Sequence, residues 1–241
     1  MGTFVDSEGI VIFSIFAIII VGVLIFYFAY YRPRYLEHKN FVKKVLENNF
    51  NVKYEFKPLE KDELVQTIRN YRMIPSGSTY KIQDAIYDNG YTSYDMHVTH
   101  TQSTGKSSHT VTDFLGKLYV IDIELSTRFI VKEARFSIGY KEFKQFETEV
   151  IDFNKLFNCY VYDEFEAQKI FTPSNIKQLY ELCSSDYDKT MLLYDKKLYV
   201  FIYNSKRNFE GIENNEKAII ADYKAQKKAV EEYIKIFKGN E

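Results

Sequence analysis

The sequence lacks the features that would point to a disulfide-rich, metal-binding or nucleic-acid-binding protein. Its two cysteines, Cys159 and Cys183, form no CxxC spacing, so reduced structural thiols in a cytosolic compartment are expected. Thirty-two basic residues face 33 acidic ones, and a net charge of −1 gives no overall field that would attract nucleic acid. Tryptophan is absent, and the 17% aromatic content is carried by Tyr and Phe, which is typical of a packed sheet.

One long stretch, Ile10 to Tyr31, contains no Asp, Glu, Lys or Arg. As a helix, its roughly 22 residues reach about 33 Å, enough to cross a hydrocarbon core of about 30 Å. No basic residue precedes Arg32 and no small-x-small site follows the stretch, whereas a cleaved secretory signal would have both. We therefore expect residues 10–31, with Ile10, Ile20 and Tyr31, to be a retained transmembrane anchor in the lipid bilayer.

The charges beside this stretch predict how it is oriented. The only charged residues before it, Asp6 and Glu8, are acidic, whereas the residues that follow include five basic ones, Arg32, Arg34, Lys39, Lys43 and Lys44. Lys and Arg in short flanks stay in the cytoplasm, so residues 1–9 are expected outside and the main domain inside the cell membrane, as a single-pass protein.

Residues 32–50 are predicted to form a juxtamembrane basic helix. Its five basic residues are candidates for contact with lipid, and the lysine-rich face lies either against anionic lipid or in solvent. Pro33 could kink or break the junction with the transmembrane helix, because proline removes a helical donor and clashes with the preceding turn.

Residues 51–212 are predicted to form a cytoplasmic α+β domain with a mainly antiparallel sheet and several short helices. The residues from Tyr80 to about Val131 are typical of β-strands, with turns at Asp88-Asn89-Gly90 and at Ser103 to Lys106. These connections are too short for helical crossovers, so the strands are expected to be antiparallel. Met191 to Tyr203 predicts a further hairpin, and Glu147 to Leu156 a short helix.

The C-terminal segment, residues 213–241, is predicted to be a long amphipathic helix. Its apolar residues lie on one stripe: Ile219, Tyr223, Val230, Tyr233 and Phe237. The helix is expected either to dock on the sheet or to pair with another chain, which leaves a homo-oligomer through this helix open.

Several motifs together resemble a family of uncharacterised bacterial membrane proteins, the domain of unknown function family 3137. The resemblance covers roughly Tyr35 to Glu210, and its most specific part is Phe146-Glu147-Thr148-Glu149-Val150-Ile151-Asp152-Phe153-Asn154-Lys155-Leu156-Phe157, followed by Asp163, Ala167 and Phe171-Thr172-Pro173. Phe114-x-Gly116 and Leu198-Tyr199-Val200 are weaker matches. The resemblance implies a membrane-tethered cytoplasmic α+β domain without established enzymatic activity, often encoded near LemA-type proteins. It supplies no catalytic residues.

Three histidines are the main candidates for chemistry. A hairpin turning at Thr104-Gly105 would place His100 opposite His109, while His97 would point to the other face of the strand from His100. A catalytic zinc needs three protein ligands, so solvated side chains without a metal or other cofactor are the favoured interpretation. Thr104-Gly105-Lys106-Ser107 resembles only half of a phosphate-binding loop, because His100 stands where the first glycine is required.

These observations favour a membrane-anchored interaction or scaffolding protein without a catalytic constellation. The alternative is a membrane-tethered metal-dependent hydrolase that uses the hairpin of His97, His100 and His109. A LemA-type membrane protein is the partner that the family resemblance suggests, and no nucleic acid is expected.

Overall fold

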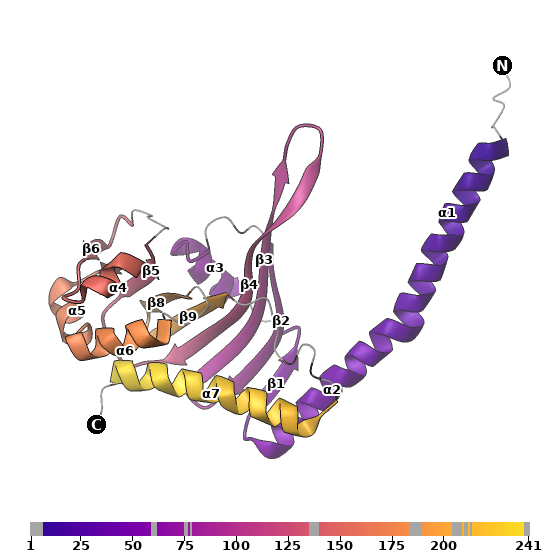
Figure 1. Cartoon of the computed structure of the whole chain (residues 1–241). Coiled ribbons are helices and arrows are strands. Elements are labelled where there is room, and N and C mark those ends of the chain that lie inside the picture. The colour runs from indigo at the N-terminus through magenta and orange to yellow at the C-terminus, as the bar shows by residue number, and fades with distance from the viewer. Residues whose placement is uncertain are drawn as a thin grey trace.

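A computed structural model describes residues 7–58, 62–74, 77, 79–134, 140–183, 189–203, 209, 212 and 214–238. Side chains are described from Ile12 onward, so the side chain of Ile10 lies outside this set, as do residues 1–6 and Glu213. Within these ranges nine strands form one sheet, and every neighbouring pair is antiparallel. The predicted α+β class with an antiparallel sheet is confirmed (Figure 1).

The order of the strands across the sheet differs from their order in the chain. From one edge to the other the strands are β1 (Lys53–Phe56), β2 (Thr79–Asp88), β3 (Tyr91–Ser103), β4 (Ser108–Asp122), β9 (Lys197–Tyr203), β8 (Lys189–Tyr194), β5 (Phe129–Glu133), β7 (Phe157–Val161) and β6 (Lys144–Phe146). The predicted turn at Asp88-Asn89-Gly90 joins β2 to β3, with Gly90 at a φ of +79° that a side chain would disfavour.

The N-terminal helix runs without a break from α1 (Ser7–Phe26) through a π-helical turn, η1 (Tyr27–Tyr31), into α2 (Arg32–Asn49). Pro33 therefore does not break it. Pro33 has no N–H to donate to an earlier carbonyl, and the wider π turn before it relieves this conflict, with the Arg32 N–H donating to the Tyr27 carbonyl. By length and composition this helix is sufficient to cross a membrane.

One face of the sheet is covered by α2 together with α4 (Ile151–Leu156), α5 (Glu164–Ile170), α6 (Pro173–Cys183) and α7 (Glu216–Lys238). The α7 helix runs along this face (Figure 1). Its predicted apolar stripe is buried, with Ile219 and Val230 fully covered by their own chain. Of the two expectations for this helix, docking on the sheet is thus the observed one, and the stripe is not available for a homo-oligomer.

The opposite face packs on α3 (Asp62–Asn70) and the segment after it. Ile68 and Met73 are fully buried there against Val98 and Leu118 of the central strands. Central strands alternate their side chains between this core and the core under α7, which fixes their register.

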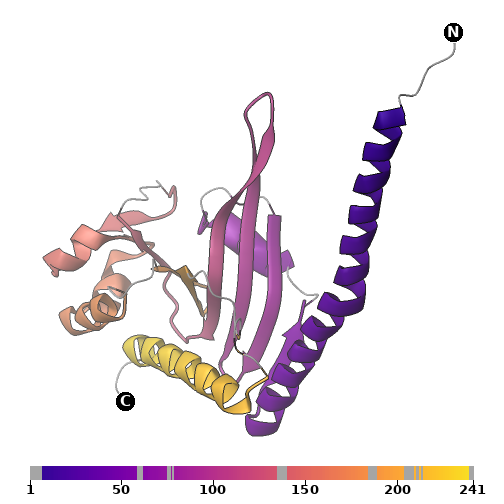
Figure 2. The ribbon, with the colours of Figure 1, turned by 45° about the vertical axis from the view of Figure 1, so that its right-hand side comes forward.

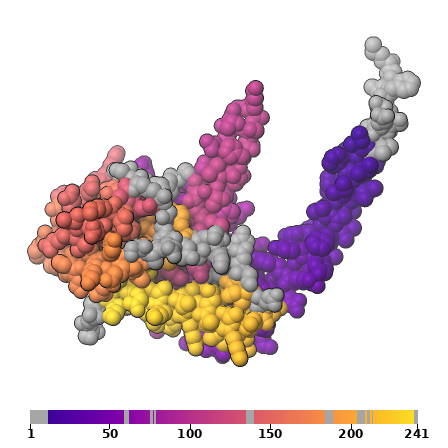
Figure 3. Space-filling model, in the orientation of Figure 1, coloured from indigo at the N-terminus to yellow at the C-terminus, as the bar shows by residue number. Residues whose placement is uncertain are grey.

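The β3–β4 hairpin extends beyond the rest of the sheet. Within the described residues, β2 pairs with it as far as Thr99 and β9 as far as Gly116, so its tip is a two-stranded ribbon. Figures 1 and 2 show that this ribbon and α1 project to the same side of the sheet. In the space-filling view the ribbon stands apart both from the body of the domain and from α1 (Figure 3).

Candidate functional site

A cleft of about 600 Å³ lies between α2 and β1, where the long helix joins the sheet. Its lining includes four lysines, Lys39, Lys43, Lys53 and Lys57, but a single carboxylate, Glu55. Two lysines come from the helix and two from the strand segment, so the cleft depends on how these elements are held together.

The two walls of the cleft, α2 and β1, run in opposite directions because the chain reverses between them. The α2 helix ends with the Phe50 N–H donating to the Leu46 carbonyl at 2.9 Å, and the chain then reverses into β1. The Tyr54 N–H donates to the Glu47 carboxylate at 3.2 Å, which fastens the strand to the last turn of the helix. At the other end of β1 the Phe56 ring packs edge-on against Tyr35, with 5.6 Å between centroids. The strand is therefore attached to the helix at both of its ends.

A buried ion pair forms the floor of the cleft. Lys39 Nζ lies 2.5 Å from Oδ2 of Asp84 on β2, and the two residues are only 6% and 1% exposed. Asp84 stands directly opposite the equally buried Asp95 across the β2–β3 pair. An unpaired carboxylate in such a place would be costly, so Lys39 is held as a counterion.

This position corrects the expectation that Lys39 faces lipid or solvent. Lys39 lies three residues before Val42 and seven before Leu46, so all three share the buried side of α2. Lys43 and Lys44 are exposed, in keeping with a polar outer side.

The titratable groups near the floor are shifted by burial. Burial, together with the charge of Asp84, raises the pKa of the Tyr54 phenol far above 10, so Tyr54 remains protonated. Burial lowers the pKa of Lys117 on β4, and the charges of Asp222 and Asp95 oppose this shift. These groups act as a packed, charge-balanced layer between the sheet and its helices.

The lysines at the rim are less tightly held than Lys39. Lys53 pairs with Glu55 at 2.6 Å, whereas Lys43 reaches Glu47 only at 3.9 Å. Lys57 Nζ lies over the Phe56 ring, 5.1 Å from its centroid.

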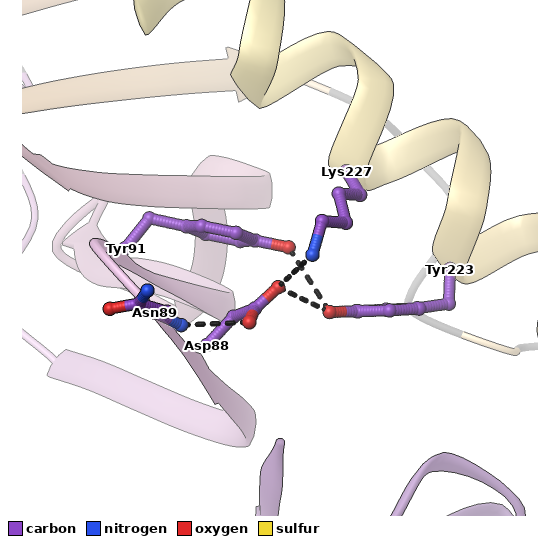
Figure 4. A network of polar contacts seen from close by, with 5 residues as sticks. All are labelled: Asp88, Asn89, Tyr91, Tyr223 and Lys227. Carbon is purple, nitrogen blue, oxygen red and sulfur yellow. Dashed lines mark hydrogen bonds and ion pairs between the residues drawn. The ribbon is translucent and has the colours of Figure 1, made fainter. Parts of the chain in front are cut away.

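A second polar network fixes α7 to the β2–β3 turn (Figure 4). The Asp88 carboxylate accepts hydrogen bonds from the Tyr223 hydroxyl at 2.6 Å, from Lys227 at 3.1 Å and from the Asn89 N–H at 2.7 Å. Burial alone would raise the pKa of Asp88, but these three donors lower it below its usual value. Because the carboxylate is held by donors from both the turn and the helix, the network acts as a structural clamp.

The three histidines are not brought together as a metal site. His100 pairs with Val111 across the hairpin, while His109 pairs with Gln102, so the predicted opposition of His100 and His109 is wrong. The cause is the position of the loop, which runs from Thr104 to Ser107. The Thr104 N–H donates to the Ser107 carbonyl at 2.9 Å, and this loop moves the partner of His100 two residues along β4, from His109 to Val111.

Each of the two inner histidines has a different partner. His100 Nδ1 lies 2.9 Å from the Asp113 carboxylate, and His97 Nε2 lies 3.2 Å from the Thr112 hydroxyl. In the part of the chain that the structure describes, no three His, Cys, Asp or Glu side chains gather where they could hold a metal ion. The geometry thus gives the hydrolase alternative no support. The half phosphate loop lies in this hairpin, with β4 rather than a helix after it.

The fold and the cleft define a class: an α+β domain built directly onto a helix of membrane-spanning length. The chain belongs to the family described as protein of unknown function (DUF3137), whose family model matches residues 108–238. This confirms the family that the motifs resemble, over a span shifted toward the C-terminus.

Comparisons with curated proteins and with solved structures do not identify a function. A search of curated proteins found no significant match. Among solved structures, the chain is similar to the crystal structure of the mycobacterial trehalose monomycolate transport factor A, TtfA. That match has 4% sequence identity and a TM-score of 0.44, and it covers 80% of this chain and 95% of that chain.

Proposed function

We propose that this protein is a membrane-anchored interaction module, with α1 in the bilayer, the N-terminus outside and the domain in the cytoplasm. The observation that carries the proposal is that one helix is both the apolar span and part of the domain core. Its first part exposes large apolar side chains such as Phe13 at 76% and Ile18 at 71%, whereas Val42 and Leu46 further along are fully buried. A bilayer would cover the first part and the sheet covers the second.

The aromatic residues at the end of the span support this placement. Tyr27 and Tyr31 stack on one another at 5.8 Å, and the Arg34 guanidinium lies 3.8 Å from the Tyr30 ring centroid. Amphipathic rings beside cationic side chains are typical of the level where a helix leaves the acyl chains. Arg32 and Arg34 at this level favour the cytoplasmic side.

Exposed apolar side chains at the end of the domain away from α1 favour an interaction role (Figure 1). Four apolar side chains there are exposed on α4, α5 and the segment before α5: Ile151 (70%), Phe165 (66%), Tyr162 (56%) and Leu156 (41%). We place the surface for a protein partner on these exposed apolar side chains. The partner we propose is the cytoplasmic part of another membrane protein, and a LemA-type protein is the specific candidate from the family resemblance alone. Confinement to one membrane would allow a modest interface to suffice.

Crosslinking in native membranes tests the interaction. We expect the full chain to capture a membrane protein, and an Ile151→Ser/Phe165→Ser double variant to capture at least several-fold less. Lys155→Ser, which changes an exposed residue of the same helix α4, is the control and should behave like the wild type. Truncation before α7 is unsuitable, since it removes buried core. Equal capture by all three forms would remove this surface from the proposal.

Protease protection tests the topology. In right-side-out vesicles the domain should resist protease added outside and be digested only after permeabilisation. Digestion of the domain in intact vesicles would contradict the proposed orientation.

A further inference from the structure

The two outer edges of the sheet differ in how they are covered. At one edge, β1 lies beside α2, and its Tyr54 N–H donates to the Glu47 carboxylate of that helix at 3.2 Å. At the other edge, β6 pairs with β7 on its inner side, and none of the described residues hydrogen-bonds to its outer side. Figure 1 shows this edge at the end of the sheet away from α1. The outer side of β6 therefore offers main-chain N–H and C=O groups to a further strand.

Exposed aromatic rings lie near β6 on both faces of the sheet. Lys144 on β6 reaches the carboxylate of Glu164 at 3.3 Å, and the next residue of α5 is Phe165, which is 66% exposed. On the side of α3, the Phe143 ring lies 6.5 Å from the ring of Tyr162, which is 56% exposed. The side chains of an added strand would alternate between these two faces, so apolar ones could cover rings on both.

The β6 strand has few of the features that keep an edge from pairing. Proline, bulges and lysines commonly protect sheet edges. No proline or bulge interrupts β6, and its one lysine, Lys144, is paired with Glu164 of α5. Its protection is its short length, Lys144–Phe146, which allows only a few main-chain hydrogen bonds. Side chains around the strand must therefore supply part of the affinity for any added strand.

The charge around β6 favours a basic partner. Between Tyr140 and Ile170, a range that the structure describes throughout, seven carboxylates outnumber four lysines. Three of these lysines are paired within the range, as Lys144 with Glu164, Lys155 with Asp152 and Lys169 with Glu166. Glu147 and Glu149, which follow β6, are exposed and have no ion-pair partner among the described residues. This end of the domain is thus acidic, although the whole chain has a net charge of only −1.

We infer that β6 accepts a basic, extended segment of the partner as an additional strand of the sheet, with Lys or Arg side chains contacting Glu147 and Glu149. This inference rests on the proposed interaction module and names the part of the partner that it binds. Cytoplasmic segments beside membrane spans are rich in Lys and Arg, so a membrane protein would present such a segment. A second copy of this chain fits less well, because two acidic edges would then face each other.

Binding of labelled peptides to the full chain in detergent micelles tests the charge of the partner. The probes are nonapeptides with Lys-Arg at both ends and five central residues drawn from Val, Ile, Thr and Tyr, measured by fluorescence anisotropy. We expect the best of them to bind about tenfold or more tightly than the same peptide with Glu at its four end positions. Equal binding of the two, or binding of neither, would overturn the inference.

Variants of the chain locate the site. Glu147→Gln/Glu149→Gln should weaken binding of the basic peptide about threefold or more, because two exposed ion pairs are lost. The control, Glu231→Gln/Glu232→Gln, removes two exposed carboxylates from α7 and should change the affinity by less than about 1.5-fold. Unchanged circular dichroism and melting show that a loss is not caused by unfolding. An equal loss in the control would mean general attraction to the acidic surface and would overturn the inference.

N-methylation of the peptide tests strand addition itself. In an added strand, alternate amides donate to β6 and the others point away. Of two peptides methylated on alternate amides, one should therefore bind about tenfold more weakly and the other within about threefold of the parent. The same effect of both methylation patterns would overturn strand addition.

Two further outcomes separate this inference from the proposed function. Crosslinking of a membrane protein that Ile151→Ser/Phe165→Ser abolishes, without any peptide binding, would overturn only strand addition at β6. Absence of both would contradict the interaction module as well. A concentration-dependent dimer that excludes the peptide would identify a second copy as the occupant of the edge and overturn the assignment to a basic partner.

Discussion

The Lys39 ammonium and the Asp84 carboxylate, 45 residues apart in the sequence, meet at 2.5 Å in the interior. Lys39 belongs to the helix that continues the apolar span, and Asp84 to the second strand of the sheet. The ion pair therefore joins the proposed anchor to the domain, and removing either partner alone would leave the other charge buried at a large cost in stability.

The first prediction concerns this pair. Lys39→Met should lower the free energy of unfolding by about 3–5 kcal/mol, because it leaves the Asp84 charge buried without a counterion. Lys39→Met/Asp84→Leu should recover much of that loss, since the Asp84 charge is removed together with its counterion. Urea unfolding of the full chain in detergent micelles measures both.

The exposed Lys44→Met on the same helix serves as control and should change stability by less than about 0.5 kcal/mol. If Lys39→Met were equally mild, the ion pair could not be what fastens α2 to the sheet.

The sequence was informative where a pattern is local. The charge-free stretch, the Asn89-Gly90 turn and the Met191–Tyr203 hairpin each depend on neighbours within a few residues, and the corresponding elements are present. The predicted helix at Glu147 to Leu156 begins later, at Ile151, because the Thr148 hydroxyl and N–H both bind the Asn154 side chain and hold an extended approach to it.

The candidate site was less predictable because its contacts are distant in sequence. Spacing alone could have placed Lys39 with Val42 and Leu46, but its partner Asp84 comes from another element. The register error at His100 arose from a turn centred one residue further along, a difference that hydrophobic alternation does not show in a polar ribbon.

The second prediction concerns the clamp on α7. Asp88→Asn should cost about 1.5–3 kcal/mol at neutral pH, because it weakens hydrogen bonds that Tyr223 and Lys227 donate to a charged group. The folded pKa of Asp88 lies below its unfolded value near 3.8. Its contribution is therefore complete above that value and is lost as the pH falls through the folded pKa.

Unfolding curves from pH 7 to pH 2 would reveal this linkage. The stability difference between wild type and Asp88→Asn should stay constant down to about pH 5 and shrink below about pH 4. Asp152→Asn, at an exposed carboxylate on α4, should show little difference at any pH. A wild-type advantage that persisted unchanged at pH 2 would contradict the role assigned to the Asp88 charge.

The third prediction concerns Lys132 on β5, which is 2% exposed and donates to the Arg72 carbonyl at 2.6 Å. Burial lowers its pKa from 10.5 to about 8. Between these values the unfolded chain binds more protons than the folded one, so stability from this group rises with pH. Below about pH 8 the folded state bears the full cost of the buried charge, about 3 kcal/mol.

Lys132→Met separates this effect from other titrations. The variant loses the donor to Arg72, a cost of about 1 kcal/mol that does not depend on pH, and it also loses the buried charge. The stability of the wild type relative to Lys132→Met should therefore be constant from pH 6 to about 7, then increase between about pH 8 and 10.5. Exposed Lys228→Met on α7 provides the comparison and should show no such rise. A relative stability that stayed flat to pH 10.5 would mean that Lys132 keeps an ordinary pKa, and that its ammonium reaches water despite its burial.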